Sequence, residues 1–127
     1  MILANGFYEW RSAAGGGAKT PFYITRPDEQ PLAMAGLWER WEKGTAPLET
    51  CTIITTAANR RLAPIHDRMP VILPPDALRA WLDPGQPLEI LEKLLAPAPE
   101  QLLATRAVSR AVNSPAHEGP ELIAAAT

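Results

Sequence analysis

Short runs of apolar residues, separated by turn-forming glycines and prolines, dominate the first half of the chain. Such runs are typical of β-strands in a protein built from many short elements. Gly36, inside the third run, predicts a bulge or a close backbone approach. The pattern predicts strands at residues 6–11, 20–26, 32–41, 51–56, 70–73 and 103–112.

Helical periodicity is clearest in residues 74–97. Two prolines favour the start of a first helix, whose apolar residues recur at helical spacing: Leu78, Trp81 and Leu82. Asp83-Pro84-Gly85 ends it, and a second helix repeats the stripe with Leu88, Leu91, Leu94 and Leu95. A third, short helix is predicted at 57–62, where alanine, arginine and leucine favour helix and Pro64 would end it. These leucine stripes indicate core packing and predict no function.

Residues 12–19 form the one low-complexity stretch, with three consecutive glycines, and predict a flexible hairpin loop. A phosphate cradle is the alternative, but no helix-forming segment follows the glycines. We expect a frayed tail at residues 124–127. Several strands, then a helical pair, then a last strand predict an α+β fold with a mainly antiparallel, curled, barrel-like sheet and a few short helices. The length favours a single domain over residues 1–127.

Composition narrows the functional classes. A single cysteine excludes an internal disulfide, and one cysteine with two distant histidines offers no metal-ligand spacing, so we expect neither metal nor cofactor. No signal peptide and no apolar stretch near the roughly 20 residues of a membrane span are visible, which predicts a cytoplasmic protein with no membrane partner. Cys51 lies in a predicted strand, where we expect it to be buried and inert. Trp38 and Trp41 are expected to pack in the core or at its rim.

The candidate chemistry begins with residues 64–73, Pro-Ile-His-Asp-Arg-Met-Pro-Val-Ile-Leu. Prolines stiffen the backbone on both sides of His66 and Arg68, which predicts a rigid, non-helical connection into a strand. If that connection is extended, both side chains point to the same side. A proton-transfer group beside a fixed positive charge suits a substrate with a phosphate or carbonyl group. The alternative is a histidine in local hydrogen bonds and an arginine paired with a carboxylate.

A second candidate is the segment Asn-Gly-Phe-Tyr-Glu-Trp at 5–10, which places Glu9 among three aromatic residues. Apolar neighbours disfavour the charged form of a carboxylate, which suits acid–base work near neutral pH. Trp10 offers a flat face on which a nucleic-acid base could stack, or it fills core volume. A solvated or ion-paired strand residue is the alternative for Glu9.

A net charge of −2 argues against a broad electrostatic surface for nucleic acid. The charge is unevenly distributed, however, because Arg60, Arg61 and Arg68 fall within nine residues whose one acid is Asp67. A local basic strip of this kind could contact a few phosphates. The alternative is a solvated, charged turn.

These segments belong to an ordered series of motifs that covers nearly all of the chain. The series comprises Gly6-Phe7-Tyr8-Glu9-Trp10, Pro21-Phe22-Tyr23-Ile24, Ala35-Gly36-Leu37-Trp38-Glu39, Cys51-Thr52-Ile53-Ile54-Thr55-Thr56-Ala57-Ala58-Asn59, His66-Asp67-Arg68-Met69-Pro70-Val71-Ile72-Leu73, Val108-Ser109 and Val112-Asn113. In this order they resemble the SRAP family, the SOS response-associated peptidases or abasic-site processing proteins.

The chain also departs from that family. Members begin with Met-Cys, lose the methionine and use the exposed cysteine as the nucleophile, whereas this chain begins Met1-Ile2. It enters the family pattern shortly before the glutamate motif, without the cysteine and without an active-site asparagine. We do not transfer the nucleophile role to Cys51. The expectation is an N-terminally truncated gene model, a fragment or a degenerate copy.

The resemblance implies a protein of the DNA-damage (SOS) response that binds single-stranded DNA and forms a covalent cross-link at abasic sites. In the intact family the cysteine amine and thiol act on the ring-opened sugar aldehyde, first as a Schiff base and then as a thiazolidine. Glu9 matches the glutamate that moves protons and assists removal of the initiator methionine. His66 matches the histidine that polarises or protonates the sugar oxygen.

The remaining matches concern DNA contact. Arg68 matches an arginine of the family that contacts a phosphate. Trp10 matches a residue that lines the DNA channel, and Thr55 and Thr56 match neighbouring positions in that channel. The expected partner is then single-stranded DNA with abasic sites. We also expect the protein to be a monomer that associates with bacterial nucleoid DNA. Two alternatives stay open, namely a peptidase, as the family name records, and a non-catalytic DNA-binding remnant. Whether the chain alone is an enzyme is therefore left open, because the nucleophile is missing.

Overall fold

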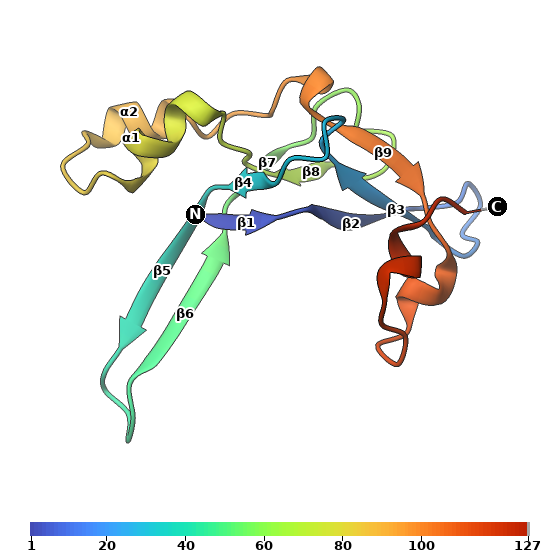
Figure 1. The fold of residues 1–127 in the computed structure, drawn as a ribbon, viewed down its shortest axis with the longest axis horizontal. Coiled ribbons are helices and arrows are strands. Elements are labelled where there is room, and N and C mark those ends of the chain that lie inside the picture. The colour runs from blue at the N-terminus through green and yellow to red at the C-terminus, as the bar shows by residue number, and fades with distance from the viewer. Residues whose placement is uncertain (127) are drawn as a thin grey trace.

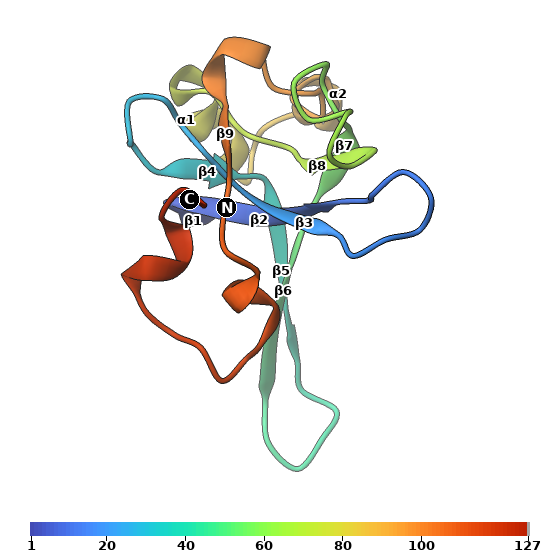
Figure 2. The same ribbon diagram turned by 90° about the vertical axis from the view of Figure 1, so that its right-hand side faces the viewer.

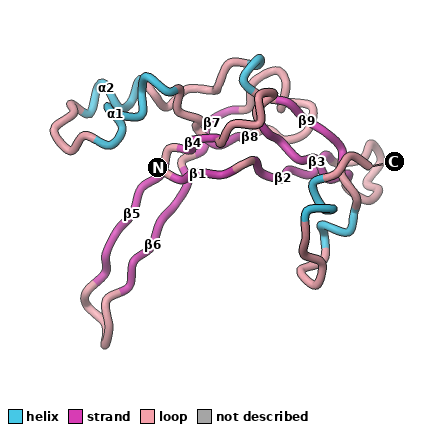
Figure 3. Tube along the Cα trace, in the orientation of Figure 1, coloured by secondary structure: helices cyan, strands magenta, loops and turns pink. Residues whose placement is uncertain are grey.

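The computed structural model describes residues 1–126 and has an α+β fold. Its strands are β1 (Ile2–Ala4), β2 (Gly6–Arg11), β3 (Thr20–Thr25), β4 (Leu32–Met34), β5 (Gly36–Trp41), β6 (Leu48–Ile53), β7 (Thr55–Ala57), β8 (Arg68–Pro70) and β9 (Ala104–Ala107). Its helices are α1 (Leu78–Leu82) and α2 (Leu88–Lys93), with 3-10 turns η1 (Pro75–Ala77), η2 (Glu100–Leu102), η3 (Arg110–Asn113) and η4 (Pro120–Ile123). Figure 3 shows how short the helical segments are beside the strands and loops. The predicted fold class is confirmed.

The strands pair in small antiparallel sheets. β2, β3 and β9 form a three-stranded sheet, while β1 pairs with β4 and β7 with β8. The fourth sheet is the β5–β6 hairpin, which projects from the body, and α1 and α2 lie together at one end of the molecule (Figures 1 and 2). No helix within residues 1–126 is long and apolar enough to cross a membrane.

The β2–β3 hairpin forms where the sequence predicts it. Gly15 and Gly16 both have φ of +83°, a conformation that glycine adopts at little cost and other residues do not, so they close the loop between the strands. The register places Glu9 opposite Phe22 and Trp10 opposite Pro21. The hairpin thus fixes which face of the sheet each candidate residue occupies.

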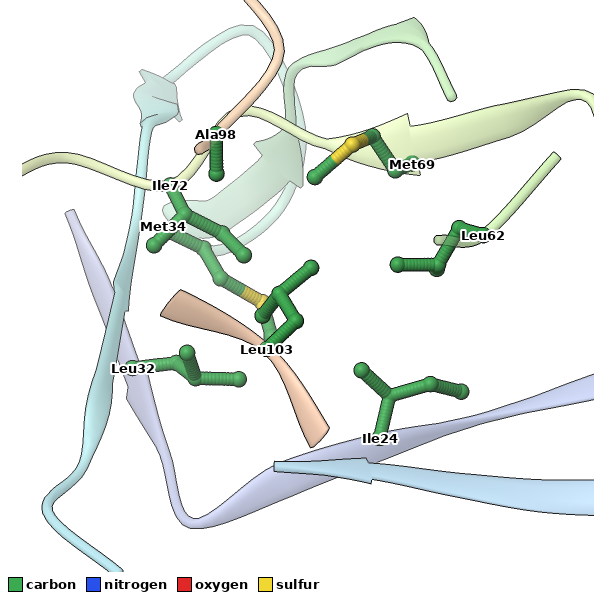
Figure 4. Close-up of a cluster of buried hydrophobic side chains, with 8 residues drawn as sticks. All are labelled: Ile24, Leu32, Met34, Leu62, Met69, Ile72, Ala98 and Leu103. Carbon is green, nitrogen blue, oxygen red and sulfur yellow. The ribbon is translucent and has the colours of Figure 1, made fainter. Parts of the chain in front are cut away.

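The main core lies between this sheet, β4, β8 and the turn before β8 (Figure 4). Its members are fully or almost fully buried: Ile24, Leu32, Met34, Leu62, Met69, Ile72, Ala98 and Leu103. Burying one such large side chain contributes about 1.5–3 kcal/mol. A second cluster, of Ala33, Ala35, Val71 and Leu73, holds the helical pair through Leu78, Trp81 and Leu94. Leu78, Trp81 and Leu94 therefore pack inward as predicted, whereas the predicted core positions Leu82, Leu88 and Leu95 are exposed.

The predicted strand at 32–41 is two strands in different sheets. The chain leaves β4 at Ala35, whose N–H donates to Val71 O at 2.8 Å and whose O accepts from Ile54 N–H at 2.9 Å. The predicted strand at 51–56 is broken in the same way, at Ile54, between β6 and β7. Gly36 follows the break, and a Cβ there would lie 2.8 Å from Thr52 O, so the predicted close backbone approach is confirmed.

The predicted helix at 57–62 is wrong. β7 extends to Ala57, and a turn follows in which Asn59 accepts hydrogen bonds from Leu62 N–H through Oδ1 at 3.0 Å and from Ala63 N–H through its backbone O at 2.8 Å. This turn inserts Leu62 into the core, and Pro64 prevents its continuation as a helix. Tertiary packing overrides the local helix propensity here.

The ends of the other elements also differ from the prediction. The strand predicted at 70–73 is β8 at 68–70, followed by a single bridge between Ile72 and Met34. The strand predicted at 103–112 ends at Ala107, and η3 follows it. The tail is not frayed through residue 126, because Ala126 N–H donates to Ala107 O at 2.9 Å, and Thr127 lies outside the described residues.

The β5–β6 hairpin corrects two further expectations. Cys51 is in a strand, as predicted, but its side chain is exposed rather than buried. Trp38 and Trp41 are 71% and 47% exposed, so neither belongs to the core. The physical reason is the position of the hairpin, which projects away from the body so that the rest of residues 1–126 does not bury these side chains (Figure 2).

Candidate functional site

Glu9 and His66 lie far apart in the sequence and meet in the fold. Glu9 is in the middle of β2, and His66 is in the turn that follows Leu62 and leads into β8. The Nε2 atom of His66 lies 4.0 Å from Oε2 of Glu9, with side-chain exposures of 41% and 23%. Both groups are therefore partly screened from water and open to a ligand.

The backbone beside His66 holds its ring. Arg68 N–H donates to Nδ1 at 3.0 Å, while Arg68 O lies 3.2 Å and Oδ1 of Asp67 3.3 Å from the same nitrogen. In the neutral ring that accepts from Arg68 N–H, the proton is on Nε2 and faces Glu9. In the imidazolium, Nδ1–H donates to the carbonyl or to Asp67 instead. Either state leaves Nε2 on the Glu9 side.

Arg68 extends from the first position of β8 toward β7. Its Nη2 donates to Thr55 O at 2.7 Å and to Thr55 Oγ1 at 2.9 Å. It forms no ion pair with any acid of residues 1–126, so its charge is not neutralised locally. Thr55 and Arg68 thus form a unit, whereas Thr56 is opposite the buried Met69 and lies on the other face of the two-stranded sheet.

Trp10 does not share a sheet face with Glu9. Successive residues of a strand point to opposite faces, so Trp10 lies with Tyr8, whose ring centroid is 6.3 Å away, and Glu9 lies with Phe7. The indole Nε1 of Trp10 donates to Asn113 Oδ1 at 2.7 Å. The expected shell of three aromatic side chains around Glu9 is therefore wrong, because two of the three are on the opposite face.

That opposite face carries residues to which we assigned no role. Tyr23, across from Tyr8, is buried, and the Arg106 guanidinium lies 5.2 Å from the centre of its ring. Burial raises the pKa of the Tyr23 phenol, Tyr8 raises it further, and Arg106 lowers it. Only the pairing of β3 with β9 brings Arg106 to Tyr23, so no local signal could have predicted this contact.

Within residues 1–126, no group of three or more histidine, cysteine, aspartate or glutamate side chains is arranged to hold an ion. The chemistry available at Glu9 and His66 is proton transfer, with the Arg68 charge on the strand that follows His66.

Comparisons with known proteins found similar sequences and similar structures. The model of the SOS response associated peptidase (SRAP) family matches residues 1–115. A Bacillus subtilis (strain 168) relative, named abasic site processing protein YoqW, is 41% identical over 125 residues, which are 97% of this chain and 55% of the relative. The Gallus gallus abasic site processing protein HMCES is 37% identical over 145 residues, covering 97% of this chain and 42% of that protein.

A solved structure has the same fold. The crystal structure of a protein from Bacteroides thetaiotaomicron superposes with a TM-score of 0.89 at 29% identity, over 99% of this chain and 56% of that one. The chain thus spans about half the length of the relatives it matches.

Proposed function

This chain belongs to the SOS response associated peptidase family, and we propose that it acts on abasic sites in single-stranded DNA in the response to DNA damage. In this proposal Glu9 and His66 move protons on the opened sugar and Arg68 holds a flanking phosphate. The observation that carries the proposal is the approach of Glu9 and His66 to within 4.0 Å. The names of the relatives supply the substrate class.

The spacing of the pair suits a ligand between the two groups. A direct N–H···O hydrogen bond spans about 2.7–3.2 Å, so at 4.0 Å the histidine and the carboxylate are not hydrogen-bonded to each other. An oxygen of the sugar can then bond to Nε2–H of His66 and to Glu9 with small side-chain movements. One group donates a proton while the other accepts one, which is the arrangement that aldehyde chemistry needs.

The reaction moves protons in both directions, which such a pair can do. When an amine adds to the aldehyde of an opened abasic sugar, a carbinolamine forms, and its hydroxyl leaves as water only after it is protonated. The C=N bond forms as that C–O bond breaks. Glu9 in its acid form or the His66 imidazolium supplies the proton, and the partner takes the one released by the amine. The amine and any thiol that closes the ring come from a nucleophile outside this pair.

Recognition would rest on the backbone of the DNA. An abasic nucleotide has no base edge to read, so phosphates and neighbouring bases must provide the contacts. Arg68 uses one of its nitrogens on Thr55, and the guanidinium keeps further N–H donors for a phosphate oxygen. Thr55 in this arrangement orients the arginine, while the role of Thr56 in DNA contact has no such geometric support.

The test is binding to a fluorescent single-stranded oligonucleotide that carries one abasic site, compared with the same oligonucleotide without the lesion. We expect the chain to prefer the abasic oligonucleotide, and we expect Glu9→Gln and His66→Ala to lower that preference at least threefold. Glu39→Gln, an exposed carboxylate on the projecting hairpin, is the matched control and should keep it. Equal affinity of the parent for both oligonucleotides would reject the proposed substrate.

A further inference from the structure

A hollow of about 340 Å³ lies on the sheet face that carries Tyr8, opposite the face of Glu9. Tyr23 and Arg106, which are cross-strand partners on β3 and β9, line it. The other lining residues come from the chain before β2, the end of β3, the turn after it and η4, and they are Asn5, Thr25, Glu29, Pro31 and Ile123. Because Glu9 is on the other face of the sheet, the proposed function makes no use of this hollow.

Arg106 is held in the hollow without a polar partner. Its guanidinium carbon lies 5.2 Å from the centre of the Tyr23 ring, and its Nε atom is buried with no hydrogen-bond partner within residues 1–126. No acid of the described chain forms an ion pair with it. A buried donor without a partner costs free energy, and native proteins usually satisfy such a group with water, an ion or a ligand. The guanidinium is therefore available to an anionic group.

Tyr23 fixes one wall of the hollow. Its side chain is almost fully buried, and a Cβ at Gly6 would lie 2.6 Å from its hydroxyl oxygen, so the glycine leaves room for the phenol. Burial raises the pKa of the Tyr23 phenol. The phenol is therefore neutral at physiological pH, and its O–H is a donor rather than a second negative charge.

Glu29 brings the opposite charge to the rim. It is the one non-glycine residue among residues 1–126 with a positive φ, of +57°, and its N–H donates to Arg26 O at 3.2 Å. Side chains rarely adopt this backbone conformation, and such strain is concentrated at ligand-binding segments. Within the described chain the Glu29 carboxylate forms no ion pair.

The two charges select the class of ligand. Arg106 and Glu29 line one hollow and do not pair with each other. A purely anionic ligand, such as a DNA phosphate, would meet the repulsion of Glu29, and a purely cationic one would meet that of Arg106. A small molecule that carries both a negative and a positive group satisfies both side chains.

The size and the apolar lining narrow the class further. Pockets for small molecules span about 300–1,000 Å³, so this hollow suits a ligand at the small end. Pro31, Ile123 and the ring of Tyr23 are apolar. We infer that the hollow binds a free α-amino acid with an apolar side chain. Its carboxylate binds Arg106, its ammonium binds Glu29, and its side chain packs on Pro31 and Ile123.

The test is an NMR titration of the isotope-labelled 127-residue chain with L-leucine. We expect saturable shifts of the backbone amide signals of Thr25, Arg106 and Ile123, and no shift for Glu39 on the projecting hairpin. L-leucinamide lacks the carboxylate and N-acetyl-L-leucine lacks the ammonium. Each should bind at least tenfold more weakly than L-leucine.

Two variants assign the charged groups. Arg106→Gln should weaken L-leucine at least tenfold and leave the affinity for L-leucinamide unchanged, because that ligand has no carboxylate to lose a partner. Glu29→Gln should likewise weaken L-leucine and leave N-acetyl-L-leucine unchanged. Arg79→Gln and Glu39→Gln, at exposed residues outside the hollow, are the matched controls and should bind like the parent. Glu29 is exposed, so its replacement tests the inference even if Arg106→Gln fails to fold.

Three results would overturn the inference. They are no saturable shift with L-leucine, equal affinity for the three ligands, and a loss of L-leucine binding in the control variants as large as in Glu29→Gln. None of these measurements uses DNA, and the residues changed do not belong to the Glu9–His66 pair. Their outcome is therefore independent of the proposed function.

Discussion

Replacing Arg68 with alanine removes a charge that no acid of residues 1–126 neutralises through an ion pair. If the guanidinium contacts one phosphate, its loss should lower the slope of log K against log salt by about 0.7 for single-stranded DNA. Between 50 and 200 mM salt, a fourfold change, that slope corresponds to a factor of about 2.6. The binding deficit of Arg68→Ala should therefore shrink about 2.6-fold across this range.

The fold should tolerate this change. Arg68 bonds to Thr55 O and Thr55 Oγ1, and both residues are exposed, so water can replace the lost donor. The assay is fluorescence anisotropy with an abasic single-stranded oligonucleotide over a salt series. Arg79→Ala is the matched control, because Arg79 is an exposed arginine on α1, away from β7 and β8.

The low net charge of the chain makes the comparison informative. At −2 the protein offers little non-specific attraction that could mask the loss of one phosphate contact. Equal slopes for the parent, Arg68→Ala and Arg79→Ala would refute a phosphate contact at Arg68. An equal fall in slope for both variants would refute a phosphate contact specific to Arg68, since the loss of any surface arginine would then have the same effect.

Three further outcomes are expected. The 127-residue polypeptide that starts with methionine should form no heat-stable adduct with abasic DNA in denaturing electrophoresis, because its terminal amine has no adjacent thiol. An adduct that is absent in Cys51→Ser would show that this exposed cysteine reacts. If the ring of Trp10 stacks on a base, Trp10→Phe should retain most of the DNA affinity, and Trp10→Ala should lose about 1–3 kcal/mol of binding free energy with little change in salt slope. An equal loss of affinity in both variants and in Asn113→Ala would instead assign the effect to the hydrogen bond from the indole to Asn113. The hydrogen bond from Arg26 lowers the pKa of Asp28 from 3.8 to about 2. The ionised Asp28 therefore stabilises the fold above pH 4, and this contribution is lost as the pH falls toward 2. NMR titration of Asp28 measures the pKa, which Arg26→Ala should return toward 3.8.

Local signals were sufficient where an element depends on its own residues. The β2–β3 hairpin follows from a glycine loop between two apolar runs, and α1 and α2 follow from stripes at helical spacing. The segment at 57–62 shows the opposite case. Its composition favours helix, but the burial of Leu62 and the hydrogen bonds to Asn59 impose a turn. Propensities of a few tenths of a kcal/mol per residue are smaller than the gain from burying one leucine.

The candidate site divides in the same way. The residue types and their stiff backbone marked His66 and Arg68, and strand alternation is enough to separate Trp10 from Glu9. The 4.0 Å between Glu9 and His66 depends on how β2 and the turn before β8 pack on a common core. That distance cannot be predicted from the pattern of neighbouring residues along the chain.

The sequence by itself determined the fold class, the helical pair, the first hairpin and the residue types of the candidate site, because each depends on neighbours along the chain. Only the tertiary structure decided which of these residues meet, where the chain changes sheets at Ala35, and that Trp38, Trp41 and Cys51 are exposed. The physical reason is that burial and contact depend on which distant segments cover a strand. A run such as residues 48–53 has the same pattern whether another polypeptide covers it or water does.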